Sequence, residues 1–291
     1  MTTIEVKLEN NEELSVRNFL KNRYGISTTV WKRVKNSGTF KLNGNLVNAT
    51  RSTVKAGDII TYDIVRQSDI EPENIPLDIR YEDKYLLVVN KPSGMLVHPT
   101  TKESSGTLGN ALLYHYQQNG ESHAFHPVHR LDRDTSGLIL IAKEPQVQFQ
   151  LSGGEKKFTR EYLAIIKGTL SPLNGSIDAP IERALPSIIK RRIAETGKPA
   201  LTYYQTIKTN GSFSLVQLML ATGRTHQIRV HLAHLGHPLL GDFLYGGDHE
   251  YIERQALHAF RLSFNHPYTK ELLVINSEPP ADMQSIISTI I

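Results

Sequence analysis

The chain has 291 residues, a net charge of +4 and no cysteine. The lack of cysteine excludes disulfides, thiolate zinc sites, cysteine-ligated iron–sulfur clusters and a cysteine nucleophile. No run of eighteen apolar residues occurs, and the N-terminal segment is acidic where a secretory signal is basic and then apolar. We therefore expect a cytoplasmic protein with no membrane segment, built as one small and one larger domain.

Positive charge is concentrated near the N-terminus. Between Glu13 and Asp58 the chain has no acidic residue but nine lysines and arginines. Such a charge run has two interpretations: a surface that binds nucleic acid, or the solvated face of an ordinary small domain. The order of secondary structure around it is needed to choose between them.

The first 65 residues predict two helices, a hairpin and a strand. Apolar residues with helical spacing begin at Val16, Ser27 is expected to cap a second helix, and Gly38 to end it. Asn43-Gly44 predicts a tight hairpin, and residues 59–64 a strand. The segments FLKNRYGISTTVWKRVKNSG, KLNGNLV and KAGDIITY, in this order, resemble the small RNA-binding domain of a ribosomal protein, here called the S-four-like domain. The resemblance implies binding to RNA through phosphate and shape contacts.

Residues 66–75 are polar and precede Pro76, which predicts a linker between a first domain at 1–65 and a second at 76–291. In the second domain, apolar runs predict strands at 85–89, 138–141, 162–166, 213–220 and 272–275. Helices are expected from a Thr107 cap to about residue 117 and from a Thr225 cap to residue 235. Because strands and helices do not alternate regularly, we expect an α+β fold with a mixed, mostly antiparallel sheet.

The densest polar stretch beside a predicted buried strand is HRLDRDTSGLILIAK, residues 129–143. It places two carboxylates among cations, and an aspartate beside an arginine or histidine stays ionised, as a nucleophile or base requires. Residues 134–137 have turn composition. Asp132 is therefore the better catalytic candidate, and Asp134 the candidate for a turn.

The segment HRLDRDTSG resembles the signature H-R-L-D-x-x-T-S/T-G of RluA/RluD-type pseudouridine synthases. Three further segments match that family in the same order: YEDKYLLVVNKPSGMLVH at 81–98, KFTREYLA at 157–164 and GRTHQIRVHLAHLGHPLLGDFLYGG at 223–247. The resemblance implies a pseudouridine synthase fold and an isomerase that converts uridine to pseudouridine in structured RNA without a cofactor or metal. Large-subunit (23S) ribosomal RNA is the expected substrate, and transfer RNA is the alternative. We expect a monomer with no obligatory protein partner.

The resemblance also implies roles for particular residues. Asp132 would be the catalytic carboxylate, Tyr162 the aromatic residue that stacks on the target base and can act as a base, and Arg229 the cation paired with the aspartate. The residues expected to bind the substrate are Lys91, His129, Arg130, Arg133, Thr135, Arg224, His226 and Gln227.

Helical geometry gives an independent expectation for Arg229. A helix capped by Thr225 places Ile228, Leu232 and Leu235 toward the core and leaves His226 and Arg229 on another side near the helix N-terminus, where an anion is favoured. The alternatives are an ordinary surface arginine and, for Tyr162, an ordinary strand tyrosine.

Three rival interpretations follow from the residues alone. His231, His234 and His237 recur every third residue, but this spacing drifts around a helix and argues against a metal site. Asp132 and Asp134 on extended backbone would lie roughly 6 to 7 Å apart, a separation that suits a nucleosidase or glycoside hydrolase. The third is a non-catalytic RNA-binding protein.

Overall fold

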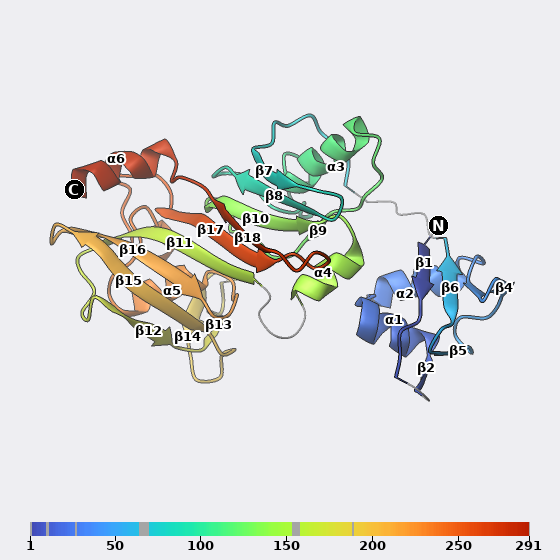
Figure 1. Ribbon diagram of the computed structural model, residues 1–291. Helices are drawn as coiled ribbons and strands as arrows, with labels where there is room; N and C mark the ends of the chain where they lie inside the picture. The colour runs from blue at the N-terminus through green and yellow to red at the C-terminus, as the bar shows by residue number, and fades with distance from the viewer. Residues whose placement is uncertain are drawn as a thin grey trace.

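The computed structural model describes residues 2–9, 12–26, 28–63, 70–152, 158–187 and 189–290. Its helices and strands form two units that follow one another along the chain, and the two termini lie at opposite ends of the molecule (Figure 1). We call them the N-terminal unit, residues 2–62, and the C-terminal unit, residues 79–290. Within the described ranges no helix is long and apolar enough to cross a membrane.

The N-terminal unit is a small α/β structure. Its four-stranded sheet has the order β1 (Thr2–Glu5), β6 (Ile59–Tyr62), β3 (Lys41–Leu42), β4 (Asn45–Leu46). The remaining elements are the paired strands β2 (Glu13–Ser15) and β5 (Thr53–Lys55) and the helices α1 (Val16–Tyr24) and α2 (Thr28–Asn36). Strands β1 and β2 were not predicted, because each is short and is stabilised by pairing with a strand more than thirty residues away.

The two predicted helices and the hairpin of this unit are confirmed. Helix α1 buries the apolar side chains whose spacing predicted it, and α2 buries Trp31 and Val34. Ser27, the expected cap of α2, lies outside the described residues. Asn43 and Gly44 have φ values of 52° and 82°, so both central residues of the hairpin take the positive φ that a tight turn requires.

A ten-stranded sheet organises the C-terminal unit. In spatial order its main path is β12 (Asn174–Asp178), β15 (Leu201–Thr209), β16 (Phe213–Leu220), β11 (Phe158–Lys167), β17 (Leu257–Asn265), β10 (Ser136–Ala142), β8 (Leu86–Lys91) and β7 (Ile79–Glu82). Strand β9 (His126–Pro127) pairs with β10, and β18 (Leu272–Asn276) with β17. Strands β13 (Ile181–Arg183) and β14 (Arg191–Ile193) form a separate pair. Among the described strand pairs only β10 and β17 are parallel, so the predicted mixed, mostly antiparallel α+β fold is confirmed.

Strand β10 is buried on both faces, which anchors the HRLD segment that precedes it. Leu138 and Leu140 pack with apolar residues of α4 (Pro145–Ser152). Ile139 and Ile141 pack on the other face with α3 (Leu108–Gln118). Thr107 caps α3 in a capping box with Asn110, as predicted.

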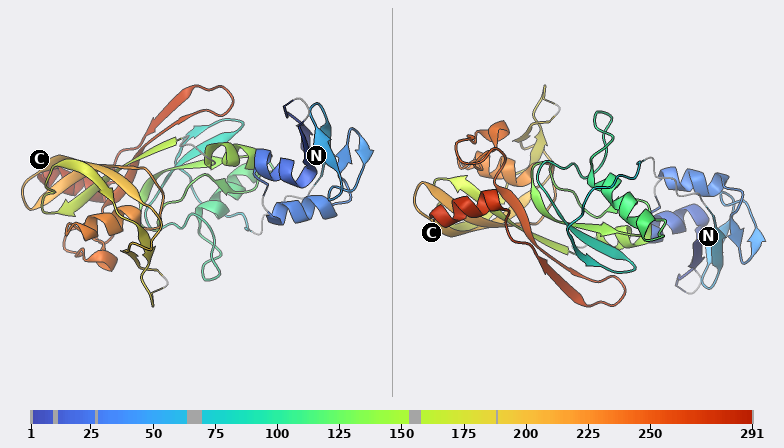
Figure 2. Two further views of the ribbon diagram at one scale, coloured as in Figure 1. Left: turned by 90° about the horizontal axis from the view of Figure 1, so that it is seen from below. Right: turned by 90° about the horizontal axis from the view of Figure 1, so that it is seen from above.

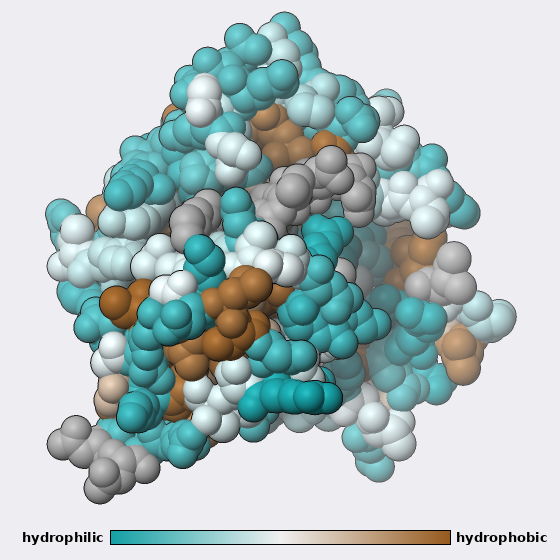
Figure 3. Space-filling view, turned by 90° about the vertical axis from the view of Figure 1, so that its right-hand side faces the viewer, coloured by the Kyte–Doolittle hydropathy of each residue, from teal (hydrophilic) through white to brown (hydrophobic). Residues whose placement is uncertain are grey.

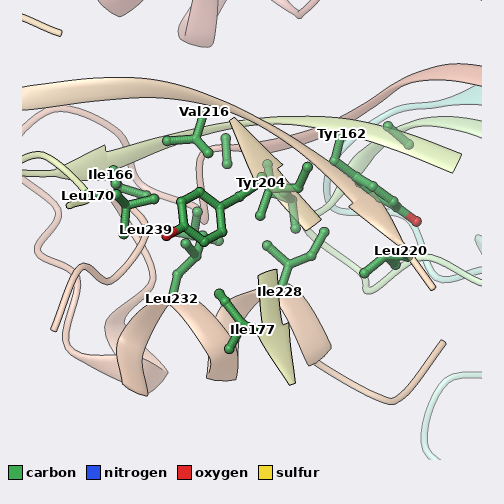
Figure 4. Packing of buried hydrophobic residues seen from close by; sticks show 14 of the residues in the cluster. Tyr162, Ile166, Leu170, Ile177, Tyr204, Val216, Leu220, Ile228, Leu232 and Leu239 are labelled. Carbon is green, nitrogen blue, oxygen red and sulfur yellow. The ribbon is translucent and has the colours of Figure 1, made fainter. Parts of the chain in front are cut away.

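Helices α5 (Gln227–His234) and α6 (Ala281–Ile290) cover the other half of the sheet. Figure 4 shows the apolar cluster between α5 and the sheet, with Ile228 and Leu232 of the helix below Val216 and Tyr204 of the strands. Helix α6 packs through Met283 and Ile286 in a separate cluster. Leu235, which was predicted to face the core, is 39% exposed because α5 ends one residue earlier.

The segment between the units falls partly outside the described residues, which omit 64–69. Residues 70–75 contain no helix or strand, and the backbone N–H of Glu73 donates to the carbonyl of Asn110 at the start of α3. The N-terminal unit lies beside α4 in both views of Figure 2, and Gly25 lies against the ring of Phe149. The proposed domain boundaries at residues 65 and 76 stay predictions.

Candidate active site

A cleft of about 350 Å³ lies between the C-terminal end of α4 and the N-terminal end of α5. The residues before β10 that line it are Val128, His129, Arg130, Leu131, Asp132 and Thr135. Strand β11 contributes Phe158, Arg160 and Tyr162. The loop before α5 contributes Gly223, Arg224, Thr225 and His226, and the first turn of α5 contributes Gln227, Ile228 and Arg229. Every predicted site residue except Lys91 and Arg133 is therefore brought to one cleft.

Asp132 begins a tight turn at the floor of the cleft. The backbone N–H of Thr135 donates to the carbonyl of Asp132 at 3.2 Å, which closes a turn over residues 132–135. The prediction of a turn at 134–137 was wrong by two residues, because Ser136 and Gly137 already belong to buried β10. Asp132 and Asp134 therefore do not lie on extended backbone, and Asp134 does not line the cleft.

Lys91 and Arg133 support this turn from outside the cleft. The Lys91 Nζ is fully buried and donates to the carbonyls of Pro92, Met95 and Arg133 at 2.7, 2.8 and 2.8 Å. Burial lowers the pKa of Lys91 to about 7. The guanidinium of Arg133 forms two hydrogen bonds with the carboxylate of Glu103. Both predicted substrate ligands are thus engaged with the protein, away from the cleft.

Asp132 is paired with Arg229, and Arg229 is shared with a second carboxylate. The Arg229 Nη1 lies 3.1 Å from Asp132 Oδ2, while its Nε and Nη2 donate to Asp242 at 2.7 and 2.8 Å. The alternative of a surface arginine is wrong, since Arg229 is 8% exposed. Burial lowers its pKa, but Asp242 and then Asp132 outweigh that effect and raise the pKa of Arg229 above its usual value.

His226 is the second side chain directed at Asp132. Its backbone has a left-handed φ of 58°, and its Nε2 lies 3.7 Å from Asp132 Oδ2 while its Nδ1 is 2.8 Å from the Tyr245 hydroxyl. Burial lowers the pKa of His226, which favours the neutral ring at neutral pH. The predicted cap at Thr225 was wrong: α5 begins at Gln227, and His226 occupies the cap position without a side-chain cap bond.

Tyr162 borders the cleft from β11. The side chain is 3% exposed, and in Figure 4 its hydroxyl points toward the side of the cluster where Leu220 lies, away from Ile166, Leu170 and Val216. Burial raises the pKa of Tyr162, so the phenol stays neutral at neutral pH. A neutral phenol can stack on a base and donate a hydrogen bond, whereas a phenolate base is disfavoured.

His129 and Phe158 form part of the wall. The ring of His129 stacks on Phe158 with centroids 5.5 Å apart, and its Nε2 accepts from the backbone N–H of Leu140 at 3.1 Å. Burial, helped by Arg160, holds the pKa of His129 well below its usual value. His129 therefore acts as a neutral residue that ties the HRLD segment to β10.

The remaining predicted ligands differ in how free their polar groups are. The Gln227 amide is buried and bonded on both ends, accepting from Thr222 and Arg224 and donating to Leu201 and Thr202. Thr135 is also buried. Arg130 and Arg224 are exposed at the cleft and are the two predicted cations best placed to meet RNA phosphates.

Three residues of the site were missed: Asp242, Tyr245 and Arg160. Asp242 is the N-cap of the short helix η1 (Phe243–Tyr245), and Tyr245 is its last residue. Gly241 and Gly247, in the quoted segment GDFLYGG, were the available signal of a tight loop. A Cβ on either one would lie 2.0 to 2.1 Å from a backbone oxygen. Arg160 carries charge into the cleft beside Phe158, its guanidinium carbon 5.0 Å from that ring centroid.

His231 and His237, near the end of α5, bond to different parts of the protein. His231 bonds through one ring nitrogen with Thr202 and through the other with the carbonyl of Ala179, and a nitrogen of His237 bonds with the carbonyl of Lys167. These contacts give His231 and His237 separate structural partners.

Comparison with known proteins decides the family. Residues 85–234 match the family model described as RNA pseudouridylate synthase. The chain belongs to this family. The synthase is 45% identical over 242 residues to an uncharacterized RNA pseudouridine synthase, YhcT, of Bacillus subtilis, covering 81% of this chain and 80% of that protein. It is 40% identical over 267 residues to ribosomal large subunit pseudouridine synthase D of Pasteurella multocida, covering 86% and 82%.

Comparison with solved structures supports the same family. The human RNA pseudouridylate synthase domain containing 1 superposes with a TM-score of 0.59 and 26% identity, covering 76% of this chain and 97% of that one. The expected RluA-type family, the fold and the isomerase activity are thus confirmed, and the synthase converts uridine in RNA to pseudouridine.

Proposed function

We propose that Asp132 is the catalytic carboxylate of this synthase and that the substrate is a uridine in large-subunit (23S) ribosomal RNA. The observation that carries the proposal is the convergence of Asp132, Tyr162 and Arg229 on one cleft, with the Asp132 side chain 19% exposed toward it. A carboxylate that is partly exposed can reach a ligand, and its pairing with a cation holds it in position.

The isomerisation of uridine to pseudouridine requires one such carboxylate. The bond between N1 and C1′ breaks, the uracil turns within the cleft, and C5 bonds to C1′ while the C5 proton is lost and N1 gains one. Asp132 would either attack C1′ or remove the C2′ proton to give a glycal. In both cases the ring of Tyr162 would hold the detached uracil by stacking, and Arg229 would hold the carboxylate in position.

A uridine within a helix has to leave its stack before it can enter the cleft. The exposed cations Arg130 and Arg224 would hold the distorted backbone at the rim of the cleft. The N-terminal unit would add the S-four-like contacts: Lys32, Arg33 and Lys35 of α2 are exposed on the face opposite its buried residues. Figure 3 views the molecule from the end occupied by this unit and shows that hydrophilic residues cover most of it.

The ribosomal substrate is supported by the relative named as a large-subunit pseudouridine synthase, which is 40% identical over most of both chains. Transfer RNA is the second candidate within the same family. Mapping pseudouridines in total RNA from cells with and without the gene distinguishes them, since the modified position disappears from one class of RNA only.

The catalytic assignment is tested with Asp132→Asn, and Asp134→Asn serves as the matched control. Asp132→Asn should bind RNA with unchanged affinity and form no pseudouridine, while Asp134→Asn should stay active. Full activity of Asp132→Asn would refute the assignment. Release of free uracil would favour the hydrolase interpretation, and an unchanged pseudouridine map in cells carrying Asp132→Ala would favour a protein that only binds RNA.

A further inference from the structure

Both side chains that contact Asp132 are held from behind by one short segment. Asp242 grips Arg229 through two hydrogen bonds, and the Tyr245 hydroxyl bonds with the Nδ1 of His226. The ring of Tyr245 also lies beneath Arg229, with the guanidinium carbon 5.1 Å from its centroid. A segment of four residues, 242–245, therefore contacts both partners of the proposed catalytic carboxylate.

We propose that Asp242 and Tyr245 are positioning residues that set the charge and orientation of the groups around Asp132. The inference rests on the proposed role of Asp132. Asp242 and Asp132 bring two negative charges and Arg229 one positive, so the trio has a net charge of −1 when both carboxylates are ionised. Asp242 takes the two-bond side of the guanidinium, formed by Nε and Nη2, and Asp132 accepts a single hydrogen bond from Nη1.

This sharing keeps Asp132 reactive. An arginine devoted to Asp132 alone would form the stronger two-bond pair and would stabilise the carboxylate in its resting state. Catalysis gains only from interactions that are stronger in the transition state than in the ground state. With Asp242 bound to Arg229, Asp132 keeps its orientation while much of its charge stays available for the sugar.

Tyr245 acts on His226, the second side chain close to Asp132. The backbone N–H of Arg191 donates to the Tyr245 oxygen at 2.9 Å, so the hydroxyl proton is free to be donated to His226 Nδ1 at 2.8 Å. In that arrangement the proton of the neutral imidazole is on Nε2, which faces Asp132. Asp132 then has one neutral N–H group 3.7 Å away and one shared cation bonded to it at 3.1 Å. The left-handed backbone of His226 is compatible with a functional constraint on this residue.

The segment is rigidly placed. Asp242 is 1% exposed, and its backbone oxygen accepts from the N–H groups of Tyr245 and Gly247. The charged and titratable groups that surround Asp132 are His226 and Arg229 at the start of α5, Asp242 and Tyr245 at η1, Tyr162 of β11 and, behind the turn, Lys91 of β8.

The test compares Asp242→Asn with Asp248→Asn, an equivalent change in the same loop at a residue paired with exposed Lys167. Total RNA from cells that lack the gene is the substrate, and the single-turnover rate of pseudouridine formation is measured from pH 5 to pH 9 alongside RNA affinity. Asp242→Asn should lower the rate by at least about tenfold at unchanged affinity, since small displacements of catalytic groups have effects of this size or larger. Asp248→Asn should match the wild type.

The pH profile separates charge sharing from a merely structural role. In Asp242→Asn, Arg229 no longer shares its positive charge with a second carboxylate and acts on Asp132 alone. The pH below which the rate falls, which is the acid limb of the profile, should therefore move to a lower value. Asp242→Glu keeps the charge and should return the limb toward its wild-type position. An unmoved limb in Asp242→Asn, or the same profile in the Asn and Glu variants, would overturn the role of Asp242.

Tyr245→Phe keeps the ring beneath Arg229 and removes only the hydroxyl, so it tests the His226 arm even if Asp242→Asn fails to fold. A several-fold lower rate at unchanged affinity is expected, and a wild-type rate would overturn the role of Tyr245.

Asp132→Asn distinguishes failure of the proposed function from failure of the positioning roles: if Asp132→Asn remains active, the proposed function fails. If it is inactive while Asp242→Asn and Tyr245→Phe behave as the wild type, only the present inference fails.

Discussion

Gly137 and Ala259 are Cα partners where β10 and β17 run parallel, and their backbones approach so closely that no side chain fits between them. A Cβ on Gly137 would lie 2.4 Å from the carbonyl oxygen of Ala259 and 2.5 Å from its nitrogen. Gly137 also has a φ of +116°, which side chains rarely adopt. This contact joins the strand that follows the Asp132 turn to the centre of the sheet.

We therefore expect Gly137→Ala to destabilise the fold by about 3 kcal/mol or more, because neither backbone can yield cheaply and positive φ adds strain. Gly211→Ala is the control: its φ is +89° but an added Cβ would have nothing within 4 Å. It should cost only about 1 kcal/mol. Urea unfolding of the two variants measures both costs, and equal losses would show that the Ala259 contact is unimportant.

Lys91 should be essential for the shape of the Asp132 turn. Lys91→Met fills a similar volume but removes the donor that three partly buried carbonyls share, and each lost hydrogen bond costs about 0.5 to 1.5 kcal/mol. We expect lower stability and a lower rate of pseudouridine formation, with exposed Lys102→Met unchanged in both. If Lys91→Met unfolds at the same urea concentration as the wild type, the three hydrogen bonds of Lys91 do not stabilise the fold.

Features that depend on neighbouring residues were predictable from the sequence. The positive φ pair at Asn43-Gly44, the Thr107 cap and the apolar runs of β10 and β16 are encoded locally, and the structure has all of them. The position of Asp132 in the cleft was predictable because the HRLD segment is a recognisable motif in front of a buried strand.

Features that depend on contacts between residues far apart in the sequence could not be predicted. Local propensity favoured Thr225 as the cap of α5, but His226 takes the cap position with a left-handed backbone while its ring contacts Asp132 and Tyr245. The pairing of Arg229 with Asp242 spans thirteen residues with an intervening loop, so no helical or strand period predicts it. Tertiary contacts of this kind override local preferences at functional sites.

Acid should destabilise the protein through its buried neutral histidines. The Nδ1 of His258 accepts from Ser136 at 2.9 Å, its Nε2 donates to the carbonyl of Ser277, and burial lowers its pKa to about 4. An unfolded histidine has a pKa near 6.5, so below that pH the unfolded chain binds a proton that the folded chain does not. Stability is then lost as the pH falls from about 6.5 to about 4, by about 3 kcal/mol from this residue.

The His258→Gln variant tests this cause. It removes the titrating ring, so its stability should fall less steeply than that of the wild type between pH 7 and pH 4.5 in urea unfolding, even if it is less stable at pH 7. The matched control is His249→Gln at an exposed position, which should keep the wild-type slope. If all three proteins lose stability in parallel, the acid sensitivity comes from other groups.

The basic face of α2 should determine how RNA affinity depends on salt. Lys32, Arg33 and Lys35 are exposed, while Trp31 and Val34 anchor the opposite side of the helix. Each phosphate contact contributes about 0.7 to 0.9 to the slope of log affinity against log salt, so changing all three cations to Gln should reduce the slope by about 2. A triple Gln variant at exposed Lys84, Lys102 and Lys270 is the control for net charge. Equal slopes for the two triple variants would show that α2 makes no phosphate contacts and that the N-terminal unit has another role.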